Sequence, residues 1–151
     1  TILLSSGSQT LGNILIDAPN TTLNMEDGAV YEGRIFVSKN ASKTAISGTQ
    51  KAEGLTASNG AGAALFLAPA DSSASIKNAL YSGNKASGAT AAMGGAVYSN
   101  GSPIYFENTV FDGNSAVITA PAKATDAATV LEPTPSEAQL MLTTALVLLL
   151  E

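Results

Sequence analysis

The sequence predicts an all-β fold, a right-handed parallel β-helix (a solenoid) with a short C-terminal helix or capping segment. The first observation is an internal repeat: residues 76–86 read IKNALYSGNKA, and residues 106–116 read FENTVFDGNSA. The apolar, aromatic, Gly and Asn positions of the two segments match, except that Ala79 becomes Thr109. A repeat of about 30 residues is typical of structural units that stack, because one unit cannot bury its apolar face alone.

The repeat extends upstream, where GAALF at 62–66 corresponds to GGAVY at 94–98. These segments are slightly further apart than the downstream ones, which is natural when one loop changes length and stacked strands keep their register. This spacing favours the β-helix over a two-layer antiparallel sheet, which is the alternative. Stacking predicts five neighbouring pairs: Asn78 with Asn108, Asn84 with Asn114, Ile76 with Phe106, Tyr81 with Phe111, and Leu65 with Val97.

The second observation is that residues 1–60 hold short apolar runs between Gly, Asn and Pro turn signals, with no helical period. We expect strands of this length throughout, and in the repeat at 63–67, 74–77, 79–82, 95–99, 103–107 and 109–112. The segment 45–49 is interpreted as a degenerate earlier copy of 80–84. The small-residue segment 85–93 and the Ala/Thr/Pro-rich segment 115–135 are expected to be loops.

The tail has a different pattern. Residues 134–137 read TPSE, a capping box with Pro in the first helical position, and 138–150 are almost wholly apolar. This tail is expected to form either a helix or two further strands. The apolar run is too short for a bilayer span, which needs about 20 apolar residues. An apolar run of this kind must cap an open end of the strands or pair with another chain. We therefore divide the chain into coils (1–116), a loop (117–135) and an apolar capping segment (136–151), and the abrupt ends suggest a fragment of a larger protein.

The composition excludes several kinds of site. The formal net charge is −5, with seven basic residues, so a nucleic-acid partner is not expected. The chain has no Cys, which excludes disulfides and thiolate metal sites, and we expect no metal and no cofactor. The low share of charged residues, 13 %, indicates an extracytoplasmic protein.

Two short motifs resemble a known family. Gly94-Gly95-Ala96-Val97, followed by Phe111-Asp112-Gly113-Asn114, resembles the paired GGA(I/L/V) and FxxN motifs of the chlamydial polymorphic membrane proteins, which are autotransporter adhesins with a β-helical passenger. A weaker pair precedes it, made of Gly62-Ala63-Ala64-Leu65 and Tyr81-Ser82-Gly83-Asn84. The resemblance covers about residues 60–116.

The resemblance implies a location on the bacterial outer-membrane surface, export by a C-terminal barrel absent from this chain, and adhesion to a host cell-surface protein receptor. Membrane association is expected only through that barrel. In that family both motifs are linked to adhesion, so the sixteen motif residues are the candidate adhesion residues. Self-association is also expected, through the open ends of the stacked strands or the apolar tail.

The same residues also have a structural interpretation. Val97 and Phe111 are typical of a core, and Asn114 of a stacked turn, so the motifs can serve adhesion by holding each coil together. Contacts would then come from exposed residues between the motifs, namely Tyr98, Ser99, Tyr105, Glu107 and Asp112. A structural spacer or stalk is the alternative to the adhesin segment.

Catalysis is not expected. Parallel β-helices include polysaccharide-active enzymes, but the chain has no His, the commonest general base. Glycoside cleavage needs two carboxylates facing one cleft, and the best local pair is Glu107 and Asp112. Lys77 and Ser82 occupy the equivalent positions one repeat earlier, so no wall of carboxylates continues there.

Overall fold

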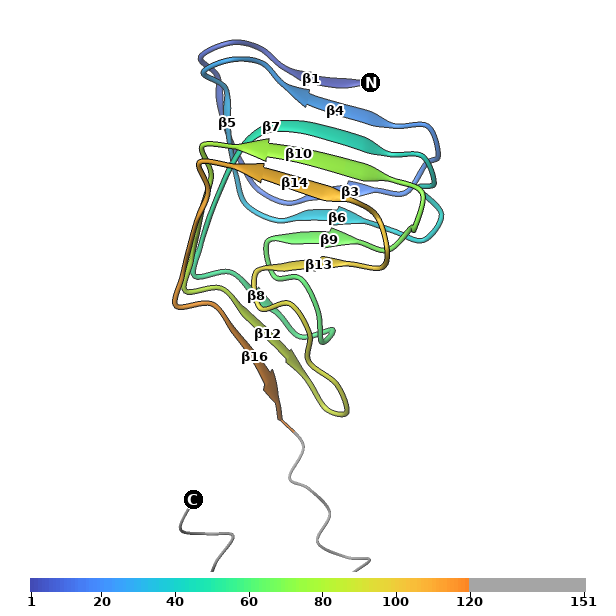
Figure 1. Ribbon diagram of the computed structural model, residues 1–151, viewed down its shortest axis with the longest axis vertical. Helices are drawn as coiled ribbons and strands as arrows, with labels where there is room; N and C mark the ends of the chain where they lie inside the picture. Colours follow the sequence, from blue (N-terminus) through green and yellow to red (C-terminus); the bar gives the residue numbers. More distant parts are fainter. Residues whose placement is uncertain (120–151) are drawn as a thin grey trace, which may run out of the picture. The chain divides into compact units, whose positions relative to one another are not determined.

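The structure, a computed structural model, describes residues 1–119, whose regular elements are all β-strands (Figure 1). The first eight are β1 (Ile2–Leu4), β2 (Gln9–Leu11), β3 (Ile14–Ile16), β4 (Thr22–Met25), β5 (Val30–Glu32), β6 (Ile35–Val37), β7 (Ala45–Glu53) and β8 (Thr56–Ala57). The next eight are β9 (Leu65–Leu67), β10 (Ser73–Lys77), β11 (Leu80–Ser82), β12 (Lys85–Gly88), β13 (Val97–Ser99), β14 (Ile104–Glu107), β15 (Val110–Asp112) and β16 (Ser115–Ile118). The predicted all-β class is confirmed, and residues 1–119 contain no helix that could cross a membrane.

Strands from successive turns of the chain lie side by side in four stacks, and their pairing is parallel throughout (Figure 1). The first stack is β1-β4-β7-β10-β14, the second β2-β5-β7-β11-β15, the third β3-β6-β9-β13 and the fourth β8-β12-β16. The long strand β7 belongs to two stacks, because its first half pairs with β4 and β10 and its second half with β5 and β11. The antiparallel alternative is therefore wrong for the described residues.

The register within the repeat matches the prediction. Ile76 pairs with Phe106, Tyr81 with Phe111, and Leu65 with Val97. The two predicted asparagine pairs also meet through their side chains, as described below. The repeated sequence thus sets which residues are neighbours in successive turns.

The turns of the chain lengthen along the molecule. Ile14 pairs with Ile35, 21 residues later, whereas Lys85 pairs with Ser115, 30 residues later. The difference is the fourth stack, to which the first two turns contribute no strand. After β5 the chain passes directly into β6, but after β7 it continues through β8 before it reaches β9 (Figure 1).

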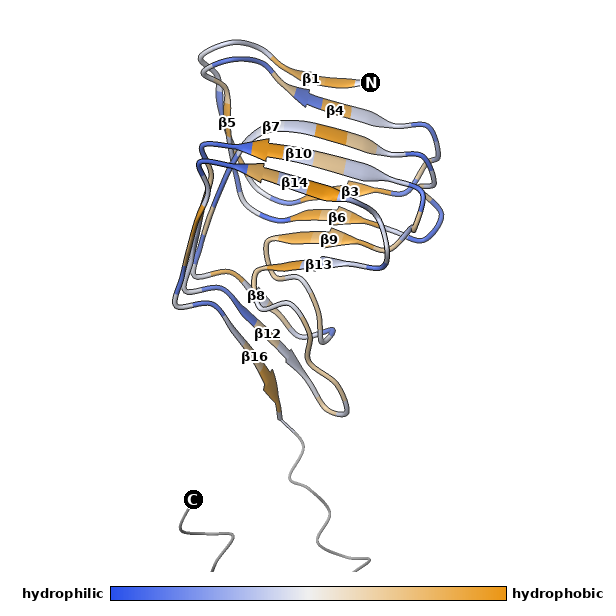
Figure 2. Cartoon of the chain, viewed as in Figure 1, coloured by the Kyte–Doolittle hydropathy of each residue, from blue (hydrophilic) through white to orange (hydrophobic). Residues whose placement is uncertain are grey.

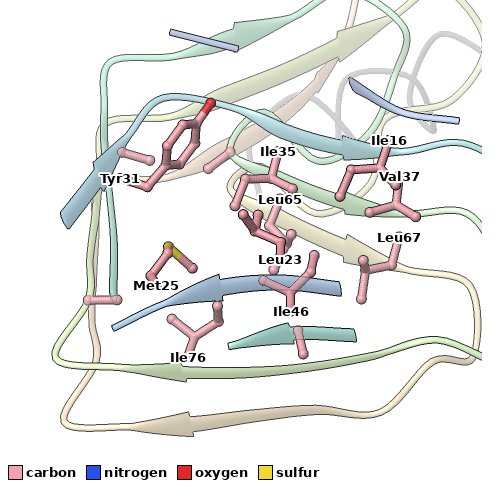
Figure 3. Close-up of a cluster of buried hydrophobic side chains, with 14 of the residues drawn as sticks. Ile16, Leu23, Met25, Tyr31, Ile35, Val37, Ile46, Leu65, Leu67 and Ile76 are labelled. Carbon is pink, nitrogen blue, oxygen red and sulfur yellow. The ribbon is translucent and has the colours of Figure 1, made fainter. Parts of the chain in front are cut away.

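The core lies between the stacks and is filled by every second residue of each strand. Leu23, Ile46 and Ile76 point inward from the first stack and face Ile35 and Leu65 of the third stack (Figure 3). Complete burial of one such side chain contributes roughly 1.5–3 kcal/mol to folding. The strands β6 and β9 are apolar along their whole length (Figure 2).

Burial falls at both ends of the stacks. On the first turn the inward-facing Ile2 is exposed and Ile14 is half-buried, although their partners in the second turn, Leu23 and Ile35, are buried. On the last described turn Phe106 and Phe111 are exposed. The phenylalanines occupy the same inward positions as buried residues of the preceding turn, so their exposure reflects the absence of a further strand over them among the described residues.

Three details of the sequence prediction are wrong. The segment 45–48 pairs with 73–76 rather than with 80–84, and Lys51–Glu53 are the true neighbours of β11. Residues 85–88 and 115–118 form β12 and β16 instead of loops, so the expected end of the coils at 116 falls inside a strand. The rest of the expected loop to 135 and the capping segment 136–151 lie outside the described residues.

Candidate functional site

The two halves of the full motif pair lie together. Gly95, Ala96 and Val97 line one hollow of about 380 Å³ with Phe111, Asp112, Gly113 and Asn114. The first group precedes and begins β13, and the second ends β15 and forms the corner before β16. Residues about 15 positions apart thus share one end of the stacks.

The glycines of the first half are required by close backbone approach. Gly94 has a φ of +56°, and a Cβ atom there would lie 2.0 Å from the carbonyl oxygen of Val97. A Cβ atom on Gly95 would lie 2.4 Å from the carbonyl oxygen of Ser115, at the start of β16. The Gly-Gly pair therefore allows the chain to turn into β13 and to pass close to the next corner.

The asparagines of the second half form a ladder between turns. Asn114 Oδ1 accepts hydrogen bonds from Asn84 N at 3.0 Å and Asn84 Nδ2 at 2.9 Å, while Asn114 Nδ2 donates to Tyr81 O at 2.8 Å. Asn84 in turn donates from Nδ2 to Ala52 O at 2.8 Å, and its Oδ1 accepts from Leu55 N at 3.0 Å. Asn108 and Asn78 form a looser pair at the exposed corner, 3.4 Å apart. The predicted asparagine pairs are confirmed.

The weaker motif copy is covered by the full copy. Gly62 N, Ala63 N and Ala64 N donate to the carbonyl oxygens of Gly94, Gly95 and Ala96. The side chains of Ala63, Ala64, Leu65, Tyr81 and Asn84 are fully buried, and only Ser82 and Gly83 at the corner reach the surface. Where a following turn is present, the motif side chains are therefore interior.

The full copy is more open. Phe111 is 49 % exposed although it stacks on Tyr81 with ring centroids 5.0 Å apart, and Val97 is half-buried. The prediction that both are core residues is therefore wrong for Phe111, because no described strand lies over it. Of the predicted surface residues, Tyr105, Glu107 and Asp112 are exposed, whereas Tyr98 and Ser99 are half-buried.

Sequence reasoning missed a buried polar group in the core. Gln50 is fully buried, donates from Nε2 to Gly33 O at 2.8 Å and Ala64 O at 3.0 Å, and accepts at Oε1 from the Tyr81 hydroxyl at 2.8 Å. All its polar atoms are satisfied, which makes burial tolerable. The alternation of β7, in which Ile46, Gly48 and Ala52 also face inward, was the signal that could have found it.

Burial raises the pKa of Tyr81 well above its usual value of about 10, and raises that of Tyr31 to about 12. The folded state therefore favours the neutral phenol. The contribution of the two neutral tyrosines to the free energy of unfolding is complete below about pH 10, and it is lost as the pH rises through their pKa values in the folded state.

We expect Tyr81→Phe to reduce the alkaline loss of stability between pH 10 and 11.5. Each buried tyrosine that must ionise on unfolding contributes a slope of about 1.4 kcal/mol per pH unit. Urea denaturation of the unsubstituted chain and of Tyr81→Phe at several pH values gives the slope of the free energy of unfolding against pH for each. The difference between the two slopes cancels the titration of the lysines that both chains share. Equal slopes would mean that the Tyr81 hydroxyl is not buried against Gln50.

Charged groups are scattered over the surface of residues 1–119. They form no group of three or more His, Asp or Glu that could hold a metal ion. Lys77 Nζ lies 2.6 Å from Asp27 Oδ1, and this hydrogen bond and charge lower the pKa of Asp27 and raise that of Lys77. Both groups lie at the surface, so the pair adds little to stability.

Neither a family model, nor a curated protein, nor a solved structure matches the chain.

Proposed function

We propose that residues 1–119 form a right-handed parallel β-helix and belong to the passenger of a bacterial surface adhesin that binds a protein receptor on a host cell. The four parallel stacks support the β-helix, and nearly all parallel crossover connections are right-handed. The adhesin rests on the resemblance of the two motifs to the polymorphic membrane proteins. The proposal includes no catalytic activity and places the protein at the outer-membrane surface.

One observation carries most of the proposal. The GGA(I/L/V)-like and FxxN-like segments share one hollow in the last described turn, and their weaker copies pair directly with them in the turn before. A motif pair whose two members meet in the last described turn can act as one structural unit. That arrangement gives a physical reason for two short motifs, separated in sequence, to occur together.

The test is adhesion of beads coated with the folded chain to human epithelial cells, beside beads coated with a heat-denatured sample. Adhesion that requires the folded chain supports the adhesin. Absence of adhesion from a sample shown to be folded by circular dichroism would contradict it.

Two variants of the last described turn separate contact from support. Tyr105 is 68 % exposed on β14, so Tyr105→Ala is expected to lower bead adhesion about fivefold or more without a change in the free energy of unfolding. Phe111→Ala is expected to lower both bead adhesion and the free energy of unfolding, because the ring packs on Tyr81 and Phe106. Loss of adhesion by Phe111→Ala at unchanged stability would instead place that ring at the receptor contact.

A structural spacer is the second candidate. It is favoured by the burial of five side chains of the weaker motif copy, which the next turn already covers: Ala63, Ala64, Leu65, Tyr81 and Asn84. The spacer predicts a folded chain that does not adhere, whereas the adhesin predicts adhesion that is sensitive to exposed residues.

A further inference from the structure

A second hollow lies on the side of the stacks, away from the last described turn. Its volume is about 370 Å³, and it is lined at the corners of three successive turns by Leu11, Gly12, Asn13, Glu32, Gly33, Lys51, Glu53 and Leu55. This volume is in the range of pockets that receive ligands, about 300–1,000 Å³.

The lengthening of the turns explains this hollow. In the first two turns the corner after β2 or β5 leads directly into the third stack, through Gly12 and Asn13 or through Gly33 and Arg34. In the third turn the chain instead runs outward from Glu53 through Leu55 into β8 (Figure 1). No described strand of the second turn pairs with β8, so the wider turn overhangs the narrower ones.

The floor of the hollow is fixed and its backbone is largely satisfied. Gly12 O accepts a hydrogen bond from the Tyr31 hydroxyl, Gly33 O accepts from Gln50 Nε2, and Gly33 N donates to Lys51 O. A Cβ atom on Gly33 would lie 1.9 Å from Gly12 O, so the two corners are in close contact. A ligand would therefore be recognised by the side chains around the opening of the hollow, which we call the rim: Leu11, Glu32, Lys51, Glu53 and Leu55.

The rim carries an excess of negative charge. Lys51 Nζ lies 3.3 Å from Glu53 Oε1, and both side chains are about half exposed. Glu32, opposite Lys51 in the register, has no ion pair among residues 1–119. Two carboxylates and one ammonium leave one negative charge, beside the apolar side chains of Leu11, which is 77 % exposed, and Leu55.

We propose that this hollow receives an arginine side chain from a partner protein. The aliphatic stem would lie against Leu11 and Leu55, and the guanidinium would pair with Glu32 and the free oxygen of Glu53, which balances the charge of the rim. Arginine fits better than lysine because its planar, weakly hydrated head group pairs with carboxylates through two parallel hydrogen bonds. The inference does not depend on the adhesin assignment.

The probe is N-acetyl-arginine amide, added to the full chain labelled with ¹⁵N and followed through its amide chemical shifts. We expect saturable shifts at Gly12, Gly33 and Leu55 with a dissociation constant on the order of 1–10 mM, as suits one partly exposed ion pair. N-acetyl-citrulline amide, which has the same shape and no charge, should bind at least fivefold more weakly. Equal binding of the two probes, or no saturable shifts at these amides, would overturn the proposal.

A pair of matched variants locates the site. Glu32→Gln is expected to weaken binding of the arginine probe fivefold or more, whereas Asp71→Asn should leave it unchanged. The second variant removes the same charge from the exposed segment between β9 and β10 and keeps the Oδ1 acceptor for Lys43 N. Amide spectra of both free variants establish that each is folded. Equal weakening by the two variants would show that the probe responds only to the net charge of the chain, and would contradict the assigned site.

Discussion

Replacing Gly48 with alanine is expected to destabilise the fold by about 4 kcal/mol or more, which is in the exceptional range for one substitution. Gly48 lies within β7 at the point where that strand passes from the first stack to the second, with a φ of +123°. A Cβ atom there would lie 2.4 Å from Met25 Cβ and 2.5 Å from Met25 O. Met25 is buried and belongs to β4, which pairs with both β1 and β7, so it cannot move aside without loss of pairing.

Gly54→Ala is the matched control for this change. Gly54 also has a positive φ, +63°, but a Cβ atom there would have no neighbour within 4 Å. Its expected cost is therefore the backbone strain alone, about 1 kcal/mol. Urea denaturation followed by circular dichroism compares the two variants, and similar costs would mean that the close approach of β4 to Gly48 is not rigid.

The stacked arrangement was predictable where two turns share a sequence pattern. The repeat aligns β10, β11 and β12 with β14, β15 and β16, and the structure keeps that 30-residue register throughout. The neighbour of Tyr81 in the preceding turn is Ala52, which carries no aromatic signal. The sequence pattern therefore aligns the third turn to the wrong segment.

The length of a turn was harder to predict than its strands. The bend at Gly48 lies inside the single strand β7, whose two halves belong to different stacks. The sequence of β7 therefore does not show where the chain turns from the first stack to the second. The fourth stack begins with only two residues, Thr56 and Ala57, too few for a recognisable alternation. Consequently the sequence does not predict the hollow at the corners of the first three turns, although it contains every residue that lines it.

The strand register explains why the two motifs meet, but it does not determine how deeply they are buried. An inward residue is buried only when another turn lies over it, and a sequence motif is the same with or without that cover. Tyr81 and Phe111 pair in register, yet Tyr81 is fully buried and Phe111 is 49 % exposed. The energetic weight of a motif copy should therefore depend on its position in the stack rather than on its agreement with a consensus.

Asn84→Ala is accordingly expected to cost about 3 kcal/mol, although Asn84 belongs to the weaker motif copy. The substitution leaves Ala52 O and Leu55 N without their partners at a fully buried position. Each buried group left unsatisfied costs about 1–3 kcal/mol. Asn114→Ala also removes bonds, to Asn84 and to Tyr81 O, but at a half-buried corner of the last described turn, where water can replace the lost side chain. Its expected cost is about 1 kcal/mol.

The free energies of unfolding of the two variants are measured in urea under identical conditions. They show whether the energetic weight of a motif asparagine depends on its position in the stack or on its agreement with the motif consensus. A larger loss for Asn84→Ala means that the asparagine ladder stabilises the stack from within, and that the full motif copy is left free to vary or to bind. An equal or larger loss for Asn114→Ala would mean that the last described turn is covered in solution, because only a cover that excludes water could make its corner as costly to disrupt as the buried one. In that case the hollow between Val97 and Phe111 would be interior, and adhesion through it would be ruled out on the same measurement.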